Sequence, residues 1–257
     1  MAIRVGIGII TYNRKDVLLE TVERVRAHTR SPCLIAVADD GSTDGTQEAM
    51  RAQNITLVTG RNMGIAWNKN RALYLLSAVA QCDAVILLED DSSPTEDGWE
   101  QAWVAAALRW GHANFAAPWL QASILRGAGT VEDPCISLDV TAQCSSFSRM
   151  ALLYAGYFDS RFRGYGQEHV EHTRRLLRVG YGGSHEDVEG EVRPIYKLLK
   201  SSITVRAEHS FSDPADRHRN WLMCRNLLFD EAYRMPWRDD EELTQFRAEM
   251  AAAVGPG

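Results

Sequence analysis

The sequence predicts an α/β protein whose central sheet is mainly parallel and carries helices on its faces. Short apolar runs rich in β-branched residues alternate with longer stretches that repeat apolar residues at helical spacing. Parallel strands need crossover connections, and helices supply these connections in proteins of this class. At 257 residues the chain can bury a real core, and we interpret it as one domain.

The elements of the first half follow one another regularly. Strands are expected at residues 3–10, 34–38, 55–58 and 84–88, and helices at residues 16–28, 44–51 and 65–79. Thr43 or Asp44 caps the second of these helices. Because the ligands of a parallel sheet bind beyond the carboxyl ends of its strands, we expect the polar residues that directly follow these strands to meet at one edge.

The second half is less regular. Helices are expected at residues 96–110, 148–155 and 167–179 and from residue 214 onward, with a break near residue 235, and strands at residues 113–118 and 136–140. Trp99, Trp103 and Trp110 share one face of the first of these helices, which is typical of core packing. We interpret residues 182–202 as a loop with a possible strand at its end.

Composition excludes several classes of protein. The chain is 45% hydrophobic and 24% charged, as ordinary globular proteins are, and its net charge of -6 argues against nucleic-acid binding. Five scattered cysteines without C-x-x-C spacing favour reduced thiols in a cytoplasm. The opening apolar run is too short for a signal peptide, and no window approaches the roughly 20 apolar residues of a membrane span. We therefore expect a soluble protein.

The stretch VILLEDDSSP, residues 85–94, places three adjacent carboxylates, Glu89, Asp90 and Asp91, directly after a predicted strand. Neighbouring acids repel one another, and neither a strand nor a turn requires them. A calcium loop needs D-x-D-x-D-G spacing, which is absent, and a solvated helix cap remains an alternative. Mg²⁺ and similar ions bind through one or two carboxylates plus substrate phosphates. The stretch is therefore a candidate site for a divalent cation with a phosphorylated substrate.

Two further segments suggest a nucleotide site. In VADDGSTDGT, residues 37–46, turn and capping chemistry explains Asp44 but leaves Asp39 and Asp40 unexplained. A carboxylate at a strand end can accept a hydrogen bond from a base or a ribose hydroxyl. In TGRNMGIAWNKNRAL, residues 59–73, Arg61 and Arg71 either contact the nucleotide or neutralise the two aspartates.

Together these segments resemble the family 2-like glycosyltransferases with the GT-A fold. ITYNR, ADDGSTDGT, GRNMGIAWNKNRAL and LLEDDSSP follow the family's order over the first hundred or so residues. The resemblance implies a Rossmann-like, mainly parallel sheet flanked by helices, with a C-terminal helical segment. Residues 1–95 would form the nucleotide-binding half, residues 96–212 the acceptor-binding half and residues 213–257 the helical appendage.

The resemblance also implies site residues. Asp91 is the expected direct ligand of Mn²⁺ or Mg²⁺, with Glu89 as the other outer acid of the D-x-D motif, and Asp40 contacts the pyrimidine. The residues expected to bind the nucleotide are Thr11, Tyr12, Asn13, Arg14, Asp40, Asn62, Gly64, Asn68, Arg71 and Asp90. Family members that invert also complete the metal site with a histidine, for which His209 is our first choice and His185 the fallback.

Residues 144–181 are similar to the acceptor-side segment of the family. That segment usually ends in Glu-Asp at the start of a helix, with the aspartate as general base, whereas this chain has Glu168 and His169. The helix dipole favours the anionic form of Glu168 and lowers its basicity. An imidazole has an intrinsic pKa near ~6.5, which suits proton transfer at neutral pH. Both residues remain candidates for the catalytic base.

The expected function is a metal-dependent, inverting glycosyltransferase that uses a nucleotide-sugar donor, a UDP-sugar above others. The acceptor is a glycan, a lipid-linked compound or a small molecule, and the expected location is cytoplasmic. The alternatives are a non-catalytic sugar-nucleotide-binding protein, a sugar-phosphate nucleotidyltransferase and a metallohydrolase built on Glu168, His169 and His172. The chain has no Gly-rich phosphate loop of the kind that a nucleotidyltransferase needs after its first strand. HVEH does not have the H-E-x-x-H spacing of a helical zinc site.

Overall fold

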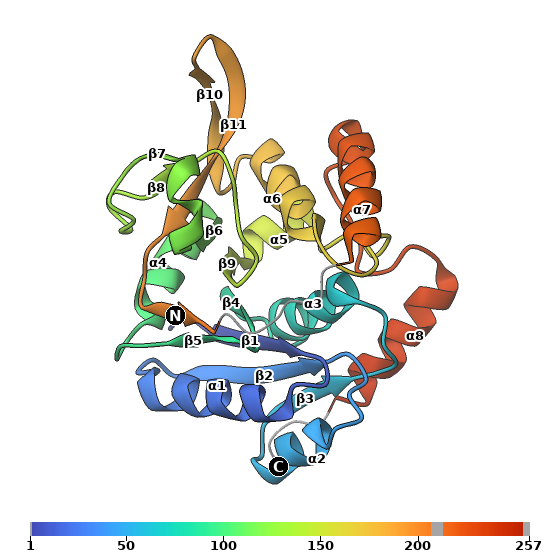
Figure 1. Ribbon diagram of the computed structural model, residues 1–257. Helices are drawn as coiled ribbons and strands as arrows, with labels where there is room; N and C mark the ends of the chain where they lie inside the picture. Colours follow the sequence, from blue (N-terminus) through green and yellow to red (C-terminus); the bar gives the residue numbers. More distant parts are fainter. Residues whose placement is uncertain (1, 207–212, 254–257) are drawn as a thin grey trace.

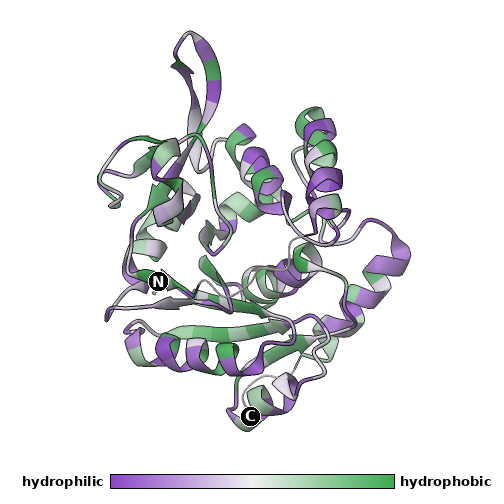
Figure 2. Cartoon of the chain, in the orientation of Figure 1, coloured by the Kyte–Doolittle hydropathy of each residue, from purple (hydrophilic) through white to green (hydrophobic). Residues whose placement is uncertain are grey.

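The protein is seen in a computed structural model that describes residues 2–206 and 213–253 (Figure 1). One large sheet runs through the molecule and carries helices on both faces, which confirms the predicted α/β class. The strands that carry apolar residues lie between helices with hydrophilic outer sides, as α1 (Lys15–His28) shows most clearly (Figure 2). No helix in the described part of the chain has the length and apolarity needed to cross a membrane.

The first half contains the predicted strand–helix alternation. Its elements are α1, β1 (Val5–Thr11), β2 (Cys33–Asp39), α2 (Thr46–Ala52), β3 (Thr56–Thr59), α3 (Ile65–Tyr74), the π-helical turn η1 (Leu75–Val79), β4 (Ala84–Glu89) and β5 (Ser92–Pro94). Asp44 accepts hydrogen bonds from the backbone N–H of Thr46 and of Lys15, so it ties the starts of α1 and α2 together. The N-cap of α2 is Gly45, which makes no side-chain cap hydrogen bond, so the prediction of a cap at Thr43 or Asp44 is wrong, and α2 begins two residues later than expected.

The second half contains more strands than the sequence predicts. Its elements are α4 (Glu100–Trp110), β6 (His112–Phe115), η2 (Pro118–Ser123), β7 (Ile124–Arg126), β8 (Cys135–Ser137), β9 (Cys144–Ser148), α5 (Arg149–Ala155), α6 (Glu168–Arg178), β10 (Gly183–Val188), β11 (Glu191–Leu199), β12 (Ile203–Val205), α7 (Pro214–Asn226), η3 (Leu227–Phe229) and α8 (Asp240–Ala251). The interpretation of residues 182–202 as mainly a loop is wrong, because β10 and β11 form an antiparallel hairpin there. The predicted helical region from residue 214, with its break near residue 235, is confirmed.

The main sheet has the order β3-β2-β1-β4-β9-β6-β11-β8-β7, and β10 pairs with β11 beside it. The first four strands are all parallel neighbours. Among the ten strands that the described residues contribute to this sheet, only β8, β9 and β10 run against the common direction. A separate antiparallel pair, β5 with β12, links the residues after β4 to the residues before the gap at 207.

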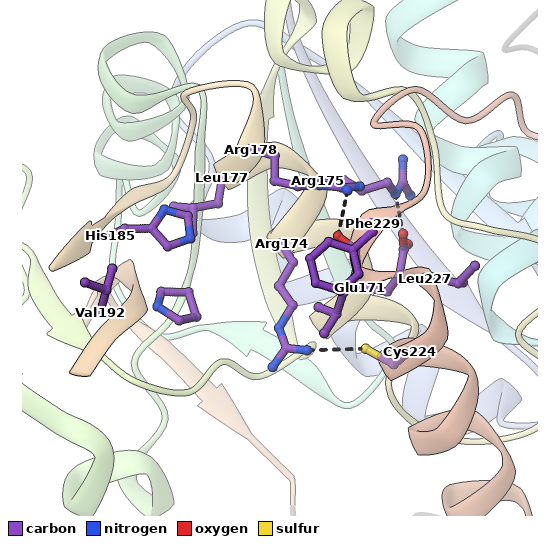
Figure 3. A pocket seen from close by; sticks show the side chains of 12 residues that line it. Glu171, Arg174, Arg175, Leu177, Arg178, His185, Val192, Cys224, Leu227 and Phe229 are labelled. Carbon is purple, nitrogen blue, oxygen red and sulfur yellow. Dashed lines mark hydrogen bonds and ion pairs between the residues drawn. The ribbon is translucent and has the colours of Figure 1, made fainter. Parts of the chain in front are cut away.

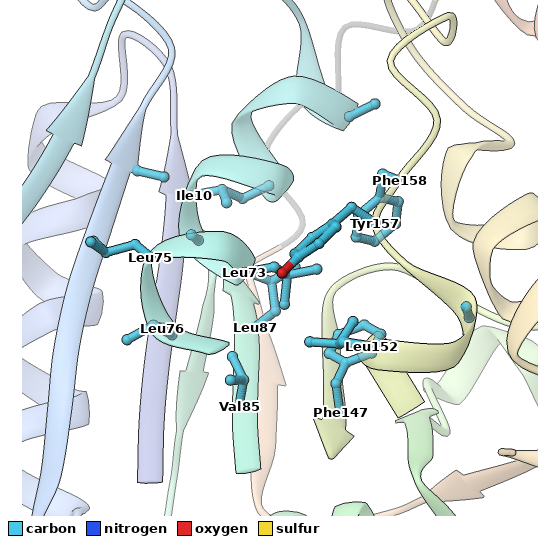
Figure 4. Close-up of a cluster of buried hydrophobic side chains, with 14 of the residues drawn as sticks. Ile10, Leu73, Leu75, Leu76, Val85, Leu87, Phe147, Leu152, Tyr157 and Phe158 are labelled. Carbon is cyan, nitrogen blue, oxygen red and sulfur yellow. The ribbon is translucent and has the colours of Figure 1, made fainter. Parts of the chain in front are cut away.

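The core has two layers, one on each face of the sheet. Along β4, Val85 and Leu87 point into the cluster that also holds α3 and α5, seen in Figure 4, whereas Ile86 and Leu88 point into the cluster of α1 and α4. The three tryptophans of residues 99–110 are buried in this second cluster, which confirms their predicted role in packing. The two layers make the sheet a rigid base for its polar strand ends.

Candidate active site at the strand ends

The carboxyl ends of β1, β2 and β4 lie at one edge of the sheet. Thr11 is aligned with Asp39, and Ile10 with Glu89, so the residues that follow these strands face a common space. A cavity of about 750 Å³, here called the strand-end cavity, opens between Thr11, Asp40 and Asp91. Its lining includes every residue predicted to bind the nucleotide except Arg71, together with Glu89 and Asp91. The acids of the second and fourth strands therefore share one cavity, as the strand order predicts.

Asp40 is held in place by the chain that follows β3. Its Oδ1 accepts the backbone N–H of Met63 (2.9 Å) and a guanidinium N–H of Arg71 (2.7 Å), and its Oδ2 accepts the N–H of Gly64 (2.8 Å). Burial raises the pKa of Asp40 above its ordinary value, although these donors oppose the shift. A carboxylate can accept about four hydrogen bonds, so Asp40 keeps capacity for a ligand in the cavity.

Arg71 does not line the strand-end cavity. Its guanidinium is fully buried, and besides Asp40 it binds Glu249 of α8 through Nε (3.0 Å) and Nη2 (3.0 Å). Arg71 therefore neutralises Asp40, which is one of the two roles expected for this arginine. Asp39 is likewise structural, because it is buried and accepts hydrogen bonds from the backbone of Ser42 and the side chain of Thr59.

The three adjacent acids at the end of β4, Glu89, Asp90 and Asp91, are each paired with a cation in this structure. Asp90 is buried and accepts from Thr11 Oγ1 (2.7 Å) and from Arg14 Nη1 (2.8 Å), and burial raises its pKa to about 7 against the effect of Arg14. Asp91 lies 3.1 Å from the same Arg14 nitrogen, and Glu89 lies 3.2 Å from Lys69 Nζ. The repulsion among the acids is thus relieved by Arg14 and Lys69.

The residues around Asp91 suit a hard divalent cation whose remaining ligands are substrate oxygens. No group of three or more His, Cys, Asp or Glu side chains arranged to hold a metal occurs among residues 2–206 and 213–253. Mg²⁺ and similar ions need only one or two carboxylates when phosphates supply further oxygens, and Asp91 and Glu89 are carboxylates in the wall of the cavity. The donor set therefore fits such an ion together with a diphosphate.

The two candidate histidine ligands, His209 and His185, lie in different parts of the chain. His209 lies outside the described residues, but Arg206, three positions earlier in the chain, donates its backbone N–H to the carbonyl of Asp91 (2.8 Å). His185 lines a second cavity, of about 560 Å³, between α6, the β10–β11 hairpin and the α7–η3 segment (Figure 3). His185 is therefore not grouped with Glu89 and Asp91, and we discard it as a ligand.

Glu168 and His169 differ in access to solvent. Glu168 is 2% exposed and forms an ion pair with Lys69 Nζ at 3.0 Å. Burial alone would raise the pKa of Glu168, but the charges of Lys69 and His169 outweigh burial and hold that pKa well below its usual range. The side chain of His169 is 21% exposed, and its Nδ1 lies 3.4 Å from Glu168 Oε1. His169 is thus the more exposed member of the pair.

Sequence reasoning missed Lys69, Gly164 and Tyr165. Lys69 is fully buried between two glutamates, although a lysine within a helix is usually solvated. Gly164 and Tyr165 line the strand-end cavity from the loop before α6. The signal that could have found the loop of Gly164 and Tyr165 is the pair of glycines at 164 and 166 that flanks the tyrosine, and both glycines have positive φ in the structure.

Comparison with known proteins agrees with this geometry. The family model described as Glycosyl transferase family 2 matches residues 7–122, which run from β1 to η2 and include the strand-end acids. The resemblance to the family 2-like glycosyltransferases is confirmed. A search of curated proteins finds no match.

Among solved structures, a mannosyltransferase from Pyrobaculum calidifontis, PcManGT, in complex with GDP-Man and Mn²⁺, is 17% identical with a TM-score of 0.58 over 98% of this chain. GalNAc-T7 with UDP, GalNAc and Mn²⁺ is 15% identical with a TM-score of 0.59 over 97% of this chain. TarS of S. aureus is 14% identical with a TM-score of 0.59 over 97%. This chain spans 65%, 54% and 43% of those chains, respectively. The likeness shows that the chain has the GT-A fold.

Proposed function

We propose that this chain is a glycosyltransferase that moves a sugar from a nucleotide-sugar donor, a UDP-sugar above others, to an acceptor hydroxyl. The observation that carries the proposal is the strand-end cavity, in which Asp40 and the acids after β4 line the same space. The family match over residues 7–122 supports it, as do the GDP-Man and the UDP bound by two neighbours of the same fold. The acceptor would be a glycan, a lipid-linked compound or a small molecule.

The nucleoside would lie against Thr11, Tyr12, Asn13 and Asp40, with its diphosphate directed toward Asp91. Tyr12 is 46% exposed and offers an aromatic face, and Asp40 has an acceptor position left for a base N–H. Arg14 carries a positive charge beside the diphosphate position. This assignment uses the residues that the cavity brings together and leaves Arg71 to support Asp40 from behind.

A bound Mn²⁺ or Mg²⁺ would supply the positive charge that stabilises a leaving diphosphate. Asp91 and Glu89 would hold such an ion, with Glu89 using Oε2 because Lys69 contacts Oε1. We retain His209 as a third ligand on the strength of the family resemblance. The cytoplasmic location likewise stays a prediction.

The chemical step would be a single displacement at the anomeric carbon. His169 Nε2 would take the proton of the acceptor hydroxyl while the acceptor oxygen forms its bond to the anomeric carbon. The bond from that carbon to the diphosphate would break, and its electron pair would leave on the diphosphate. Displacement of this kind inverts the configuration, so a UDP-α-sugar gives a β-linkage.

The metallohydrolase alternative loses its second imidazole. His172 is 1% exposed, and its Nε2 lies 2.9 Å from the carbonyl of Gly156, so it is used inside the core. The non-catalytic binding module and the nucleotidyltransferase are separated from our proposal by the experiment below.

The test measures nucleoside diphosphate released from a panel of UDP- and GDP-sugars, with and without Mn²⁺, for the wild type and two variants. Asp91→Asn should lower the release by two orders of magnitude or more, since the carboxylate that would hold the cation at the diphosphate is lost (about 10²–10³-fold per electrostatic contact). Glu23→Gln on the exposed face of α1 removes the same charge and should leave the release unchanged. Nucleotide binding without any turnover would indicate the binding module, and release of pyrophosphate from a nucleoside triphosphate would indicate the nucleotidyltransferase.

A further inference from the structure

One buried ammonium joins the strand-end cavity to the helix that carries His169. Lys69 Nζ lies 3.2 Å from Glu89 Oε1 and 3.0 Å from Glu168 Oε1, and the lysine side chain is 1% exposed. Lys69 belongs to α3, Glu89 ends β4, and Glu168 is the first residue of α6. Glu89 also lines the cavity, so two ion pairs separate the cavity wall from the start of α6.

Lys69 and His169 both contact the buried carboxylate of Glu168. Lys69 Nζ lies 5.4 Å from the centre of the Phe158 ring, which fixes the ammonium from a third side. Both Lys69 and His169 approach Oε1 of Glu168, while Oε2 is buried without a hydrogen-bond partner in the described structure. A small rotation of the imidazole would let Nδ1–H reach either oxygen, and contacts of this kind shorten in complexes with substrate.

We propose that Lys69 is a positioning residue for His169. It fixes the carboxylate of Glu168 beside the imidazole, so that Glu168 accepts a hydrogen bond from Nδ1–H and Nε2 is left to take the proton of the acceptor hydroxyl. The inference rests on the proposed function for the role of His169, but the arrangement of Lys69, Glu89, Glu168 and His169 does not depend on any substrate.

The physical reason lies in the cost of burying a single charge. Without Lys69, Glu168 would keep only the imidazole of His169 beside its buried carboxylate and would take up a proton more readily. A protonated carboxyl gains an O–H donor, and donation to Nδ1 would favour the tautomer of His169 with its proton on Nε2. In that tautomer Nε2 cannot take the proton of the acceptor hydroxyl, and the wrong tautomer of a catalytic histidine costs a large part of its rate enhancement.

Nuclear magnetic resonance of ¹⁵N-labelled histidine tests the arrangement in the absence of substrate. The signals of His169 are assigned by their loss in His169→Asn. The neutral imidazole should carry its proton on Nδ1 in the wild type, and this preference should be lost in both Lys69→Met and Glu168→Leu. Glu171→Leu is the matched control, because Glu171 is a buried, ion-paired glutamate one turn along α6, bound to Arg175. It should leave the His169 signals as they are.

Kinetics provide the second readout once a donor is known. Lys69→Met and Glu168→Leu should each lower kcat about 10²-fold or more, with the donor KM within about threefold of the wild type. The double variant should be no slower than Glu168→Leu alone, because Lys69 acts through Glu168. The double variant also removes both buried charges, so it can be measured in place of Lys69→Met if that single variant does not fold.

The proposal is overturned if Lys69→Met keeps the His169 tautomer of the wild type, or if the two losses multiply in the double variant. A donor panel that gives no turnover would contradict the proposed function alone, since the resonance experiment would still report on Lys69, Glu168 and His169.

Discussion

Arg71 and Glu249, 178 residues apart in the chain, form a buried two-point ion pair beside the strand-end cavity. Glu249 also accepts the indole N–H of Trp67 (3.0 Å), and Phe246, one turn earlier on α8, packs edge-on against the same indole at 5.3 Å. The other side of the Arg71 guanidinium holds Asp40. The last helix, expected only as an appendage, thus supports the acid that we assign to the nucleotide.

Replacement of Glu249 by Gln should therefore weaken both the fold and the site. Breaking a buried ion pair costs about 3–5 kcal/mol, and the lower end applies here because Arg71 keeps Asp40. Urea denaturation measures this loss, and calorimetry of UDP binding measures the weaker site. Glu241→Gln, at an exposed position of the same helix, should change the unfolding free energy by less than about 0.5 kcal/mol. Equal losses in the two variants would contradict the role of Glu249.

Arg14 lies where a divalent cation and a diphosphate would meet, and its removal should affect the two in opposite directions. Burial opposes the guanidinium charge, but Asp90 and Asp91 raise the pKa of Arg14 above its ordinary value. Arg14→Gln should tighten binding of Mn²⁺ alone by about tenfold, because one positive charge near Asp91 is lost. The same change should weaken binding of UDP, since the diphosphate loses a cation.

Calorimetry with Mn²⁺ alone and with UDP alone checks this prediction. Lys15→Gln, the next residue along, removes the same charge at the start of α1 and should change each affinity by no more than about twofold. If Arg14→Gln changed both affinities in the same direction, the assignment of Arg14 to the diphosphate would be wrong.

The convergence of Asp40 and Asp91 could be predicted from the sequence because it follows from strand order. In parallel strands the carboxyl ends share an edge, so each acid directly after a strand has a known place. The fold class follows from the same alternation. Neither inference depends on which face of a helix is buried.

The burial of Lys69 and Glu168 could not be predicted, because it depends on which faces of α3 and α6 are buried. The start of α6 reads as a solvated surface, yet Glu168, Glu171 and Arg175 all point inward and pair with other elements or with each other. Charged residues show no periodicity that separates a buried ion pair from an exposed one. The hairpin of β10 and β11 was missed for a similar reason, since it extends from the body and β10 lacks a buried face.

His112 makes the stability of the fold depend on pH. Its Nδ1 lies 2.9 Å from the carbonyl of Ser146, and its Nε2 lies 3.0 Å from the amide nitrogen of Asn114. Burial lowers the pKa of His112 to about 4, although the Ser146 carbonyl opposes the shift. The folded protein therefore keeps this imidazole neutral at pH values where the unfolded chain, with a pKa near ~6.5, binds a proton.

The sign follows from that difference in bound protons. Between about pH 6.5 and pH 4 the unfolded state binds more protons, so the unfolding free energy falls as the pH is lowered, by about 3 kcal/mol in total from this residue. Above this window His112 contributes no slope. Urea denaturation at a series of pH values should show the fall in the wild type, whereas His112→Gln should lose less stability over the same window. Because carboxylates also titrate there, the difference between the two proteins is the quantity to compare, and a difference that stays constant from pH 7.5 to pH 4 would contradict the buried neutral state of His112.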